Sequence, residues 1–219
     1  FIGPSGCGKT TSLKMINRLI EPTSGTISID GTDVRGQSET ELRRRVGMVF
    51  QGGSLFPHMT VAKNIAIVPK LLGWDSARIR QRTDDLLGVL GLQDDAGKLV
   101  ADYSAGMTKK IGLATAMVHA PSVLVLDEPF ESVDPVSAAH IRGLLADFVS
   151  NGGTVVLSSH VMELVERLCS HVAVINDGAL VAAGTLAEVG GGNLEQRFAE
   201  LVGATEATGG LPWLRPSRG

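Results

Sequence analysis

The first residues of the chain have the types and the spacing needed to hold a phosphate chain. Gly3 and Gly8 are separated by four residues, and Lys9 and Thr10 follow at once, which is the Walker A pattern. Glycines let backbone N–H groups turn toward an anion, and a following helix adds its positive end. Lys9 can then reach the β- and γ-phosphates, and the Thr10 hydroxyl can bind Mg²⁺. A glycine-rich turn before a helix would explain the glycines but not the Lys-Thr pair. We therefore expect a nucleotide-binding loop made of Gly3, Pro4, Ser5, Gly6, Cys7, Gly8, Lys9, Thr10 and Thr11.

A pair of carboxylates follows a second segment, "SVLVLDEPF", which predicts a buried strand ending in Asp127 and Glu128. Burying charge is unfavourable unless the charge is paired or holds a metal, and Mg²⁺ near Asp127 would provide that compensation. Glu128 would then polarise a water for attack on the γ-phosphate. A plain strand-end turn is the alternative for this pair alone. The complete Walker A pattern favours the catalytic interpretation.

Two further polar residues follow predicted strands. Gln51 ends the segment 46–50 and could bind Mg²⁺ or orient a water, although a polar strand cap is an equal alternative. His160 follows "TVVLSS" and could contact the γ-phosphate, although a lone histidine after a strand is more often structural. The other histidines have no such context and are expected to be structural: His58, His119, His140 and His171.

The elements that must position these residues alternate between strands and helices. This alternation predicts an α/β fold with a mostly parallel sheet between helices, and ligands bind at the carboxyl ends of such strands. An inserted helical lobe is expected at about 58–120, and a hairpin is expected to turn at 176–178. Apolar residues at helical spacing predict a first helix that starts near Lys9 and is ended by Pro22 and Gly25; they are Leu13, Ile16, Leu19 and Ile20.

Composition narrows the classes of function. The chain of 219 residues fits one large domain, and its net charge of −3 and aromatic content of 4% disfavour a nucleic-acid-binding protein. The only cysteines, Cys7 and Cys169, provide no disulfide framework, which suits a reducing compartment. An apolar run of about 20 residues, as a membrane span requires, is missing from the sequence. Any work at a membrane is therefore expected to need a partner.

An ordered set of motifs resembles the ATP-binding subunit of ABC transporters. The motifs are "GPSGCGKTT", "VFQ", "YSAGM", "VLVLDEP", "SVDP" and "SSH", and the resemblance covers residues 1–205. It implies a P-loop NTPase fold with an inserted helical subdomain, with ATP and Mg²⁺ as cofactors. It also implies a homodimer in which two copies meet head to tail. The remaining residues, 206–219, are rich in Gly and Pro and are expected to form a poorly ordered tail.

The resemblance also implies roles for single residues. Glu128 resembles the general base, His160 the switch histidine, Gln51 the Q-loop glutamine and Asp134 the D-loop aspartate, while Lys9 completes the catalytic set. Thr10, Gln51 and Asp127 are the implied metal ligands. Within "YSAGM", Ser104 and Gly106 are expected to meet the partner's γ-phosphate, and Ser104 is expected to cap the following helix. Glu131 departs from the family, because a small residue is common there.

The implied partner is an integral membrane permease subunit, contacted near Gln51 and the helical lobe. This places the protein at the cytoplasmic face of the cell membrane as a peripheral subunit. Residues before about Gln93 resemble glycine betaine or quaternary-amine importers, and later residues resemble exporter-type (ABC-2) ATPases. We therefore expect uptake of a small cationic osmolyte, with export as the close alternative. A soluble non-transport ABC protein and a nucleotide-binding remnant without turnover are further alternatives.

The start of the chain is a second departure. Members of this family have strands before the Walker A loop and an aromatic residue there that stacks on adenine, whereas this chain begins with Phe1 and Ile2. We expect the N-terminal strands to be missing, which would strip one edge of the sheet. Nucleotide affinity and stability would then be lower than in a chain that has these strands.

Overall fold

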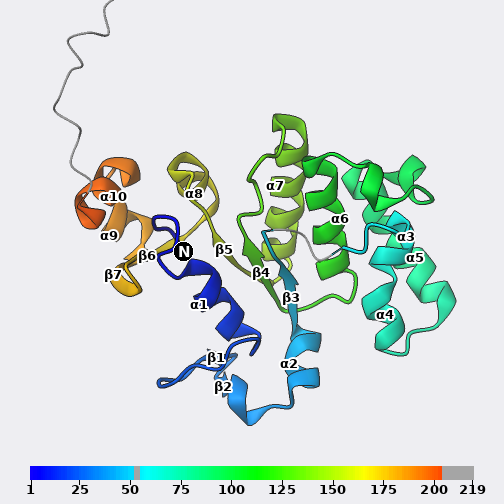
Figure 1. The fold of residues 1–219 in the computed structure, drawn as a ribbon, viewed down its shortest axis with the longest axis horizontal. Coiled ribbons are helices and arrows are strands. Elements are labelled where there is room, and N and C mark those ends of the chain that lie inside the picture. The colour runs from blue at the N-terminus through cyan, green and yellow to red at the C-terminus, as the bar shows by residue number, and fades with distance from the viewer. Residues whose placement is uncertain (52–54, 204–219) are drawn as a thin grey trace, which may run out of the picture.

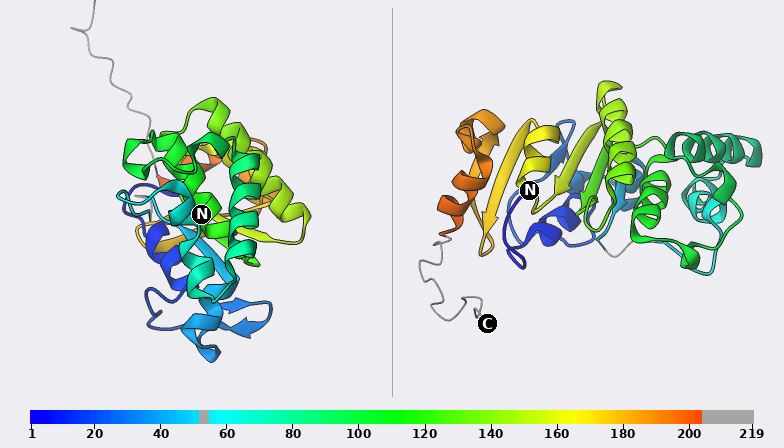
Figure 2. Two further views of the ribbon diagram at one scale, coloured as in Figure 1. Left: turned by 90° about the vertical axis from the view of Figure 1, so that its right-hand side faces the viewer. Right: turned by 90° about the horizontal axis from the view of Figure 1, so that it is seen from above.

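A computed structural model of the chain describes residues 1–51 and 55–203 (Figures 1 and 2). Its central sheet contains three parallel strands in the order β3-β4-β5. The bounds are Val46–Val49 for β3, Val123–Asp127 for β4 and Thr154–Ser158 for β5. The predicted α/β fold with a mostly parallel sheet is therefore confirmed.

The residue before the glycine-rich loop joins this sheet to a hairpin. Ile2 forms parallel bridges to Ser159 after β5 and to Val174 of β6, and it is fully buried. Strands β6 (His171–Asn176) and β7 (Ala179–Thr185) pair antiparallel around a turn in which Asp177 and Gly178 have φ values of 47° and 77°. The predicted hairpin is confirmed, and its first strand lies beside the start of the loop.

The two faces of β4 bury different side chains. Leu124 and Leu126 pack in the cluster that includes Ile111 of α6 (Ala105–Met117) and Ile141 of α7 (Pro135–Ser150). Val123 and Val125 pack with Leu13 of α1 (Lys9–Ile16) on the opposite face. All of β4 is buried because helices cover both of its faces, as its continuous apolar run predicts.

Two groups of helices lie toward opposite ends of the molecule (Figure 1). The segment predicted to be a helical lobe contains α3 (Val61–Ile65), α4 (Ile67–Leu71) and α5 (Ser76–Leu90) beside α6, and Figure 1 shows them together at one end. The hairpin lies toward the other end, with α9 and α10. The further elements are β1 (Ser28–Ile29), β2 (Thr32–Asp33), α2 (Glu39–Arg45), α8 (Met162–Leu168), α9 (Leu186–Gly190) and α10 (Leu194–Val202).

The first helix is shorter than predicted. It begins at Lys9 but ends at Ile16, so the prediction that Leu19 and Ile20 belong to its apolar face is wrong. Arg18 adopts a left-handed conformation with φ 50°, which turns the chain away from the helix axis. Leu19 and Ile20 are consequently 46% and 38% exposed, and Pro22 and Gly25 lie beyond the helix end.

The predicted tail, 206–219, lies outside the described residues. In the part of the chain that the structure does describe, the helices are too short or too polar for any of them to cross a membrane.

Candidate nucleotide site

The loop between Ile2 and α1 owes its shape to its glycines. A Cβ atom on Gly3 would lie 2.2 Å from the carbonyl oxygen of Ile175, so β6 leaves no room for a side chain there. Gly6 and Gly8 have φ values of 79° and 107°, which disfavour any other residue. Lys9 folds back over this loop, and its Nζ donates to the carbonyl oxygens of Gly3 (2.7 Å) and Pro4 (3.0 Å).

Asp127 is the point where three segments of the chain meet. The residue as a whole is only 2% exposed. Its side chain accepts a hydrogen bond at Oδ2 from the Thr10 hydroxyl (2.8 Å) and another at Oδ1 from the Ser158 hydroxyl (2.6 Å). The structure therefore brings together Thr10 and Asp127, which the sequence predicts as metal ligands. A hydroxyl and one carboxylate fit Mg²⁺, which usually takes one or two carboxylates together with phosphate oxygens and water. These two residues would hold it.

Glu128 has a strained backbone beside this contact. Its φ of 48° is left-handed, a conformation that costs a non-glycine residue about 1–3 kcal/mol and occurs often at functional sites. The Glu128 N–H donates to the Ser158 hydroxyl oxygen at 2.9 Å, and Oε2 lies 3.0 Å from Nδ1 of His160. The predicted base and the predicted switch histidine therefore lie in contact.

Ser158 is a site residue that the sequence interpretation missed. It is fully buried, and its hydroxyl donates to Asp127 while accepting from the backbone of Glu128. The parallel register pairs Asp127 with Ser158, which places the hydroxyl beside both carboxylate residues. A polar side chain at the carboxyl end of an apolar strand was the signal that could have identified it.

Gln51, the third predicted metal ligand, does not contact the other two, Thr10 and Asp127, in the part of the chain that the structure describes. Its Nε2 donates to Oε2 of Glu131 at 3.1 Å, and its backbone carbonyl oxygen accepts from Nζ of Lys109 at 3.2 Å. A role of Gln51 at the metal stays a prediction, and it would use the amide oxygen Oε1, because Nε2 donates to Glu131.

The residues expected to face a second copy cap two neighbouring helices. The Ser104 hydroxyl accepts from the N–H of Met107 at the start of α6, as predicted. Asp134 accepts from the N–H groups of Val136 and Ser137 at the start of α7, and the hydrogen bonds from Ser137 are the main reason that its pKa lies below the usual range. A Cβ on Gly106 would lie 2.9 Å from Oδ2 of Asp134, so these helix starts lie side by side.

The histidines predicted to be structural lie away from these contacts. Burial lowers the pKa of His119, and Nδ1 of His140 lies 3.1 Å from Nζ of Lys110. The His58 ring packs edge-on against Phe56.

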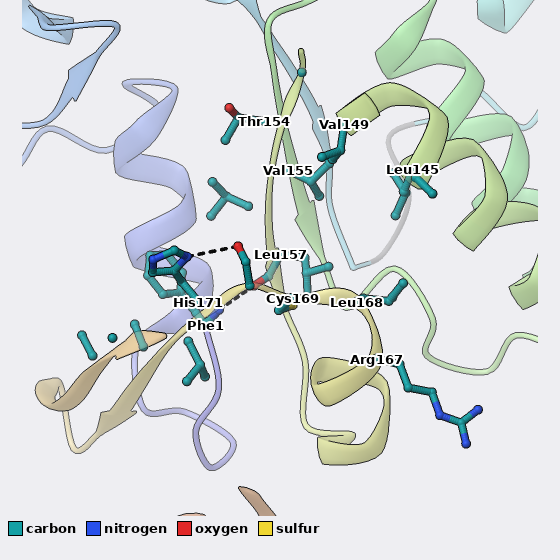
Figure 3. A pocket seen from close by; sticks show the side chains of 18 of the residues that line it. Phe1, Leu145, Val149, Thr154, Val155, Leu157, Arg167, Leu168, Cys169 and His171 are labelled. Atoms are coloured by element: carbon teal, nitrogen blue, oxygen red, sulfur yellow. Dashed lines mark hydrogen bonds between the residues drawn. The ribbon is translucent and has the colours of Figure 1, made fainter. Parts of the chain in front are cut away.

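A cavity of about 920 Å³ lies away from the loop, between β5 and β6 (Figure 3). Its walls are mostly apolar and include Leu145, Val155, Leu157 and Leu168. Phe1, which precedes Ile2, also lines this cavity. The residues that line this cavity include none of the predicted site residues, so it is not the nucleotide site.

A glycine-rich loop before α1 and a buried Asp-Glu pair at the end of a parallel strand define a P-loop NTPase domain. Residues 1–131 match the family described as ABC transporter, and the chain belongs to this family.

Sequence relatives extend the similarity beyond those residues. The chain is 42% identical over 186 residues to the osmoprotectant import ATP-binding protein OsmV of Salmonella typhimurium, covering 83% of this chain and 48% of the relative. It is 38% identical to the glycine betaine/carnitine/choline transport ATP-binding protein OpuCA of Bacillus subtilis, covering 86% of this chain and 50% of the relative. The chain thus spans about half the length of these two relatives.

Solved structures agree with the fold. The structure of an ATP binding subunit of an ABC transporter superimposes with a TM-score of 0.82 at 26% identity, covering 91% of this chain and 86% of that chain. The ATP-binding cassette MJ0796, in a dimeric post-hydrolysis state bound to ADP and Pi, superimposes with a TM-score of 0.76 at 27% identity; 84% of this chain and 83% of that chain are covered.

Proposed function

We propose that this chain is the ATP-binding and ATP-hydrolysing part of an ABC importer for small osmolytes such as quaternary amines. One observation carries the catalytic part: the Ser158 hydroxyl is hydrogen-bonded to both Asp127 and Glu128. Asp127 is in turn hydrogen-bonded to Thr10, and Glu128 contacts His160. This arrangement supports a role for Thr10 and Asp127 as a metal-binding pair and for Glu128 as the carboxylate that accepts a proton from water.

The residues divide the work as follows. The loop amides and Lys9 bind the phosphates, which requires Lys9 to leave the carbonyl oxygens of Gly3 and Pro4. Thr10 and Asp127 would hold Mg²⁺, which would neutralise phosphate charge. Glu128 orients and deprotonates the attacking water, and the contact with His160 fixes the direction of its carboxylate. Ser104 and Gly106 of a second copy complete the site in the homodimer.

Import is supported by the relatives. The matched length of 186 residues in the osmoprotectant relative cannot fit within the importer-like part that ends near Gln93, so similarity to importers continues into the part that resembles exporters. Another relative with an import name, the glycine betaine uptake protein YehX of Escherichia coli, is 41% identical over 190 residues. Export is the outcome that would contradict this assignment.

The helical lobe offers a place for the membrane subunit, at the cytoplasmic face of the membrane. A groove of about 300 Å³ between α3, α4 and α5 is lined by three basic residues and one acidic one, Lys63, Lys70, Arg80 and Asp84, and Leu71, next to Lys70 in the chain, is 81% exposed. A permease segment with apolar and acidic side chains complements this surface. Leu71→Glu should weaken co-purification with the permease, whereas Leu180→Glu, on the exposed side of β7, should not.

Transport in vesicles tests the proposal directly. The full-length protein that contains this chain is reconstituted in vesicles with a permease encoded by a gene next to its own. ATP-driven accumulation of labelled glycine betaine inside right-side-out vesicles is then measured. Accumulation that disappears with Glu128→Gln supports the proposal. Outward movement of the label, or ATP hydrolysis that no permease changes, would contradict import.

A further inference from the structure

Lys109 of α6 connects the helical lobe to the ends of two strands of the central sheet. Its Nζ donates to the carbonyl oxygen of Glu128, after β4, at 2.9 Å and to that of Gln51, after β3, at 3.2 Å. The same helix begins with Ser104 and Gly106, which are proposed to meet the nucleotide of a second copy. One side chain thus links the start of α6 to the backbone of the proposed base.

The surroundings of Lys109 keep this link in place. Partial burial lowers the pKa of the Lys109 ammonium, while the carboxylates of Glu131, Asp127 and Glu128 act in the opposite direction. An ammonium taken partly out of water gains most from acceptors at fixed positions. The two carbonyl oxygens are such acceptors, since the strand ends hold them.

Glu131 restrains the same region from the other side. Its Oε2 accepts from the Gln51 side-chain amide, and its backbone N–H donates to the Glu128 carbonyl oxygen at 3.2 Å. Gln51 is therefore held twice, at its backbone by Lys109 and at its amide by Glu131. While Nε2 donates to Glu131, it cannot donate to a phosphate or a water at the Asp127 side, and the same bond fixes the direction of Oε1, the amide atom that would bind Mg²⁺.

We propose that Lys109 is a positioning residue that transmits movement of α6 to Glu128 and Gln51, and that Glu131 holds the Gln51 amide until magnesium-bound nucleotide displaces it. The inference rests on the proposed function, because it assumes that Glu128 and Gln51 act on ATP. It adds two residues that contact neither phosphate nor water in the mechanism above. It also gives a physical role to Glu131, where the family commonly has a small residue.

Replacement of Glu131 should free the Gln51 amide to act at the nucleotide site while leaving the phosphate loop unchanged. In Glu131→Ser, the Mg²⁺ concentration that gives half-maximal binding of a non-hydrolysable ATP analogue should fall about fivefold, the worth of one modest hydrogen bond. Glu163→Ser, an exposed residue of α8, is the matched control and should leave this concentration unchanged. Calorimetry at a series of Mg²⁺ concentrations measures both. An unchanged or higher Mg²⁺ requirement in Glu131→Ser overturns the restraining role.

Removal of the Lys109 ammonium should separate turnover from binding. Lys109→Met should lower kcat about tenfold or more and change KM for ATP less than twofold, because the phosphate loop is untouched. Lys109→Arg should restore much of the rate, since a guanidinium can donate to both carbonyl oxygens. Lys98→Met, on the same lobe, is the control.

The outcomes distinguish the two proposals. If the wild-type protein neither binds nor hydrolyses ATP, the proposed function fails. If it does both and Lys109→Met matches it, only the positioning role fails. Should Lys109→Met not fold, Lys109→Gln is measured instead, because it removes the charge and shortens the reach of the side chain: a kcat about tenfold below that of Lys98→Met supports the role, and an equal kcat overturns it.

Discussion

The Thr10 hydroxyl donates to Oδ2 of Asp127 at 2.8 Å, across 117 positions of sequence. This contact joins the first turn of α1 to the end of β4 and places the proposed metal ligands side by side. Hydroxyl-to-carboxylate hydrogen bonds are among the stronger ones in proteins, so the contact also holds α1 in position against the sheet.

Thr10→Val should reduce the magnesium-dependent part of ATP affinity. Valine keeps the shape of threonine but removes the hydroxyl, and a hydrogen bond to a charged group contributes about 1.5–3 kcal/mol, or roughly tenfold to a hundredfold in affinity. Calorimetry with ATP in the presence of Mg²⁺ or of EDTA measures this part. Ser12→Ala is the control, because the Ser12 hydroxyl donates to the carbonyl oxygen of Gly8, the residue before the helix, and not to Asp127. Equal Mg²⁺ dependence in Thr10→Val and wild type would remove Thr10 from the metal site.

Glu128→Gln should abolish most hydrolysis while leaving ATP binding intact. A glutamine has the same shape but cannot take a proton from water, and general-base catalysis contributes about 10²–10⁴-fold to rate. Phosphate release measures the rate, and calorimetry measures the binding. Glu163→Gln, on the exposed side of α8, should retain full activity. A Glu128→Gln protein that hydrolyses ATP at more than about a tenth of the wild-type rate would show that another group is the base.

Ser158→Ala should lower both stability and nucleotide affinity. The substitution leaves Oδ1 of Asp127 and the Glu128 N–H buried without this partner, which costs about 1–3 kcal/mol. Urea unfolding measures the loss. The control is Ser150→Ala, because the Ser150 hydroxyl donates to an exposed carbonyl oxygen at the end of α7. Similar unfolding free energies for the two variants would mean that Ser158 does not support the carboxylates.

The site residues that adjacent sequence could predict are those next to strong local patterns. Lys9 and Thr10 directly follow a glycine-rich loop, and Asp127 and Glu128 directly follow the apolar residues of a strand. Each pair can therefore be located from the residues next to it in the sequence. Their roles stay predictions, but their positions follow directly from the pattern.

The residues that sequence could not supply depend on register and on local backbone conformation. Ser158 reaches Asp127 only because β4 and β5 pair in one particular register, and Lys109 reaches Glu128 only because α6 packs beside the strand ends. Leu19 and Ile20 fit a helical pattern, yet a left-handed Arg18 ends the helix before them. The spacing of apolar residues cannot reveal that one residue of the segment has a positive φ.

Tyr103, the only tyrosine in the chain, should ionise at unusually high pH. Partial burial, and after it the nearby charge of Asp95, raises the pKa of Tyr103 to about 12. The phenol also donates to the backbone carbonyl oxygen of Asp95 at 3.2 Å. The unfolded chain should titrate near pH 10. Because the folded pKa is the higher one, the stabilisation is complete below about pH 10 and is lost as the pH rises toward 12.

Absorbance at 295 nm follows the phenolate during this titration. The native protein should show a midpoint near pH 12, and protein in guanidinium should show one near pH 10. Tyr103→Phe should show no transition, since no other tyrosine is present. A midpoint near 10 in protein that circular dichroism shows to be folded would contradict this environment of the Tyr103 hydroxyl.

Gly47→Ala should destabilise the sheet, although alanine is otherwise tolerated in strands. A Cβ on Gly47 of β3 would lie 2.2 Å from the Ala116 carbonyl oxygen of α6 and 2.8 Å from Cδ2 of Leu124, so the helix or the strand must shift. Overpacking of this kind costs about 1–3 kcal/mol, which lowers Tm by several degrees in a domain of this size.

Gly36→Ala is the matched control, because its Cβ would meet nothing within 4 Å. Thermal unfolding of both variants measures the difference, and a Tm for Gly47→Ala equal to that of Gly36→Ala would mean that α6 can move away from β3 at little cost. Since α6 also carries Ser104 and Lys109, such freedom would weaken the case that movement of this helix is transmitted to Glu128.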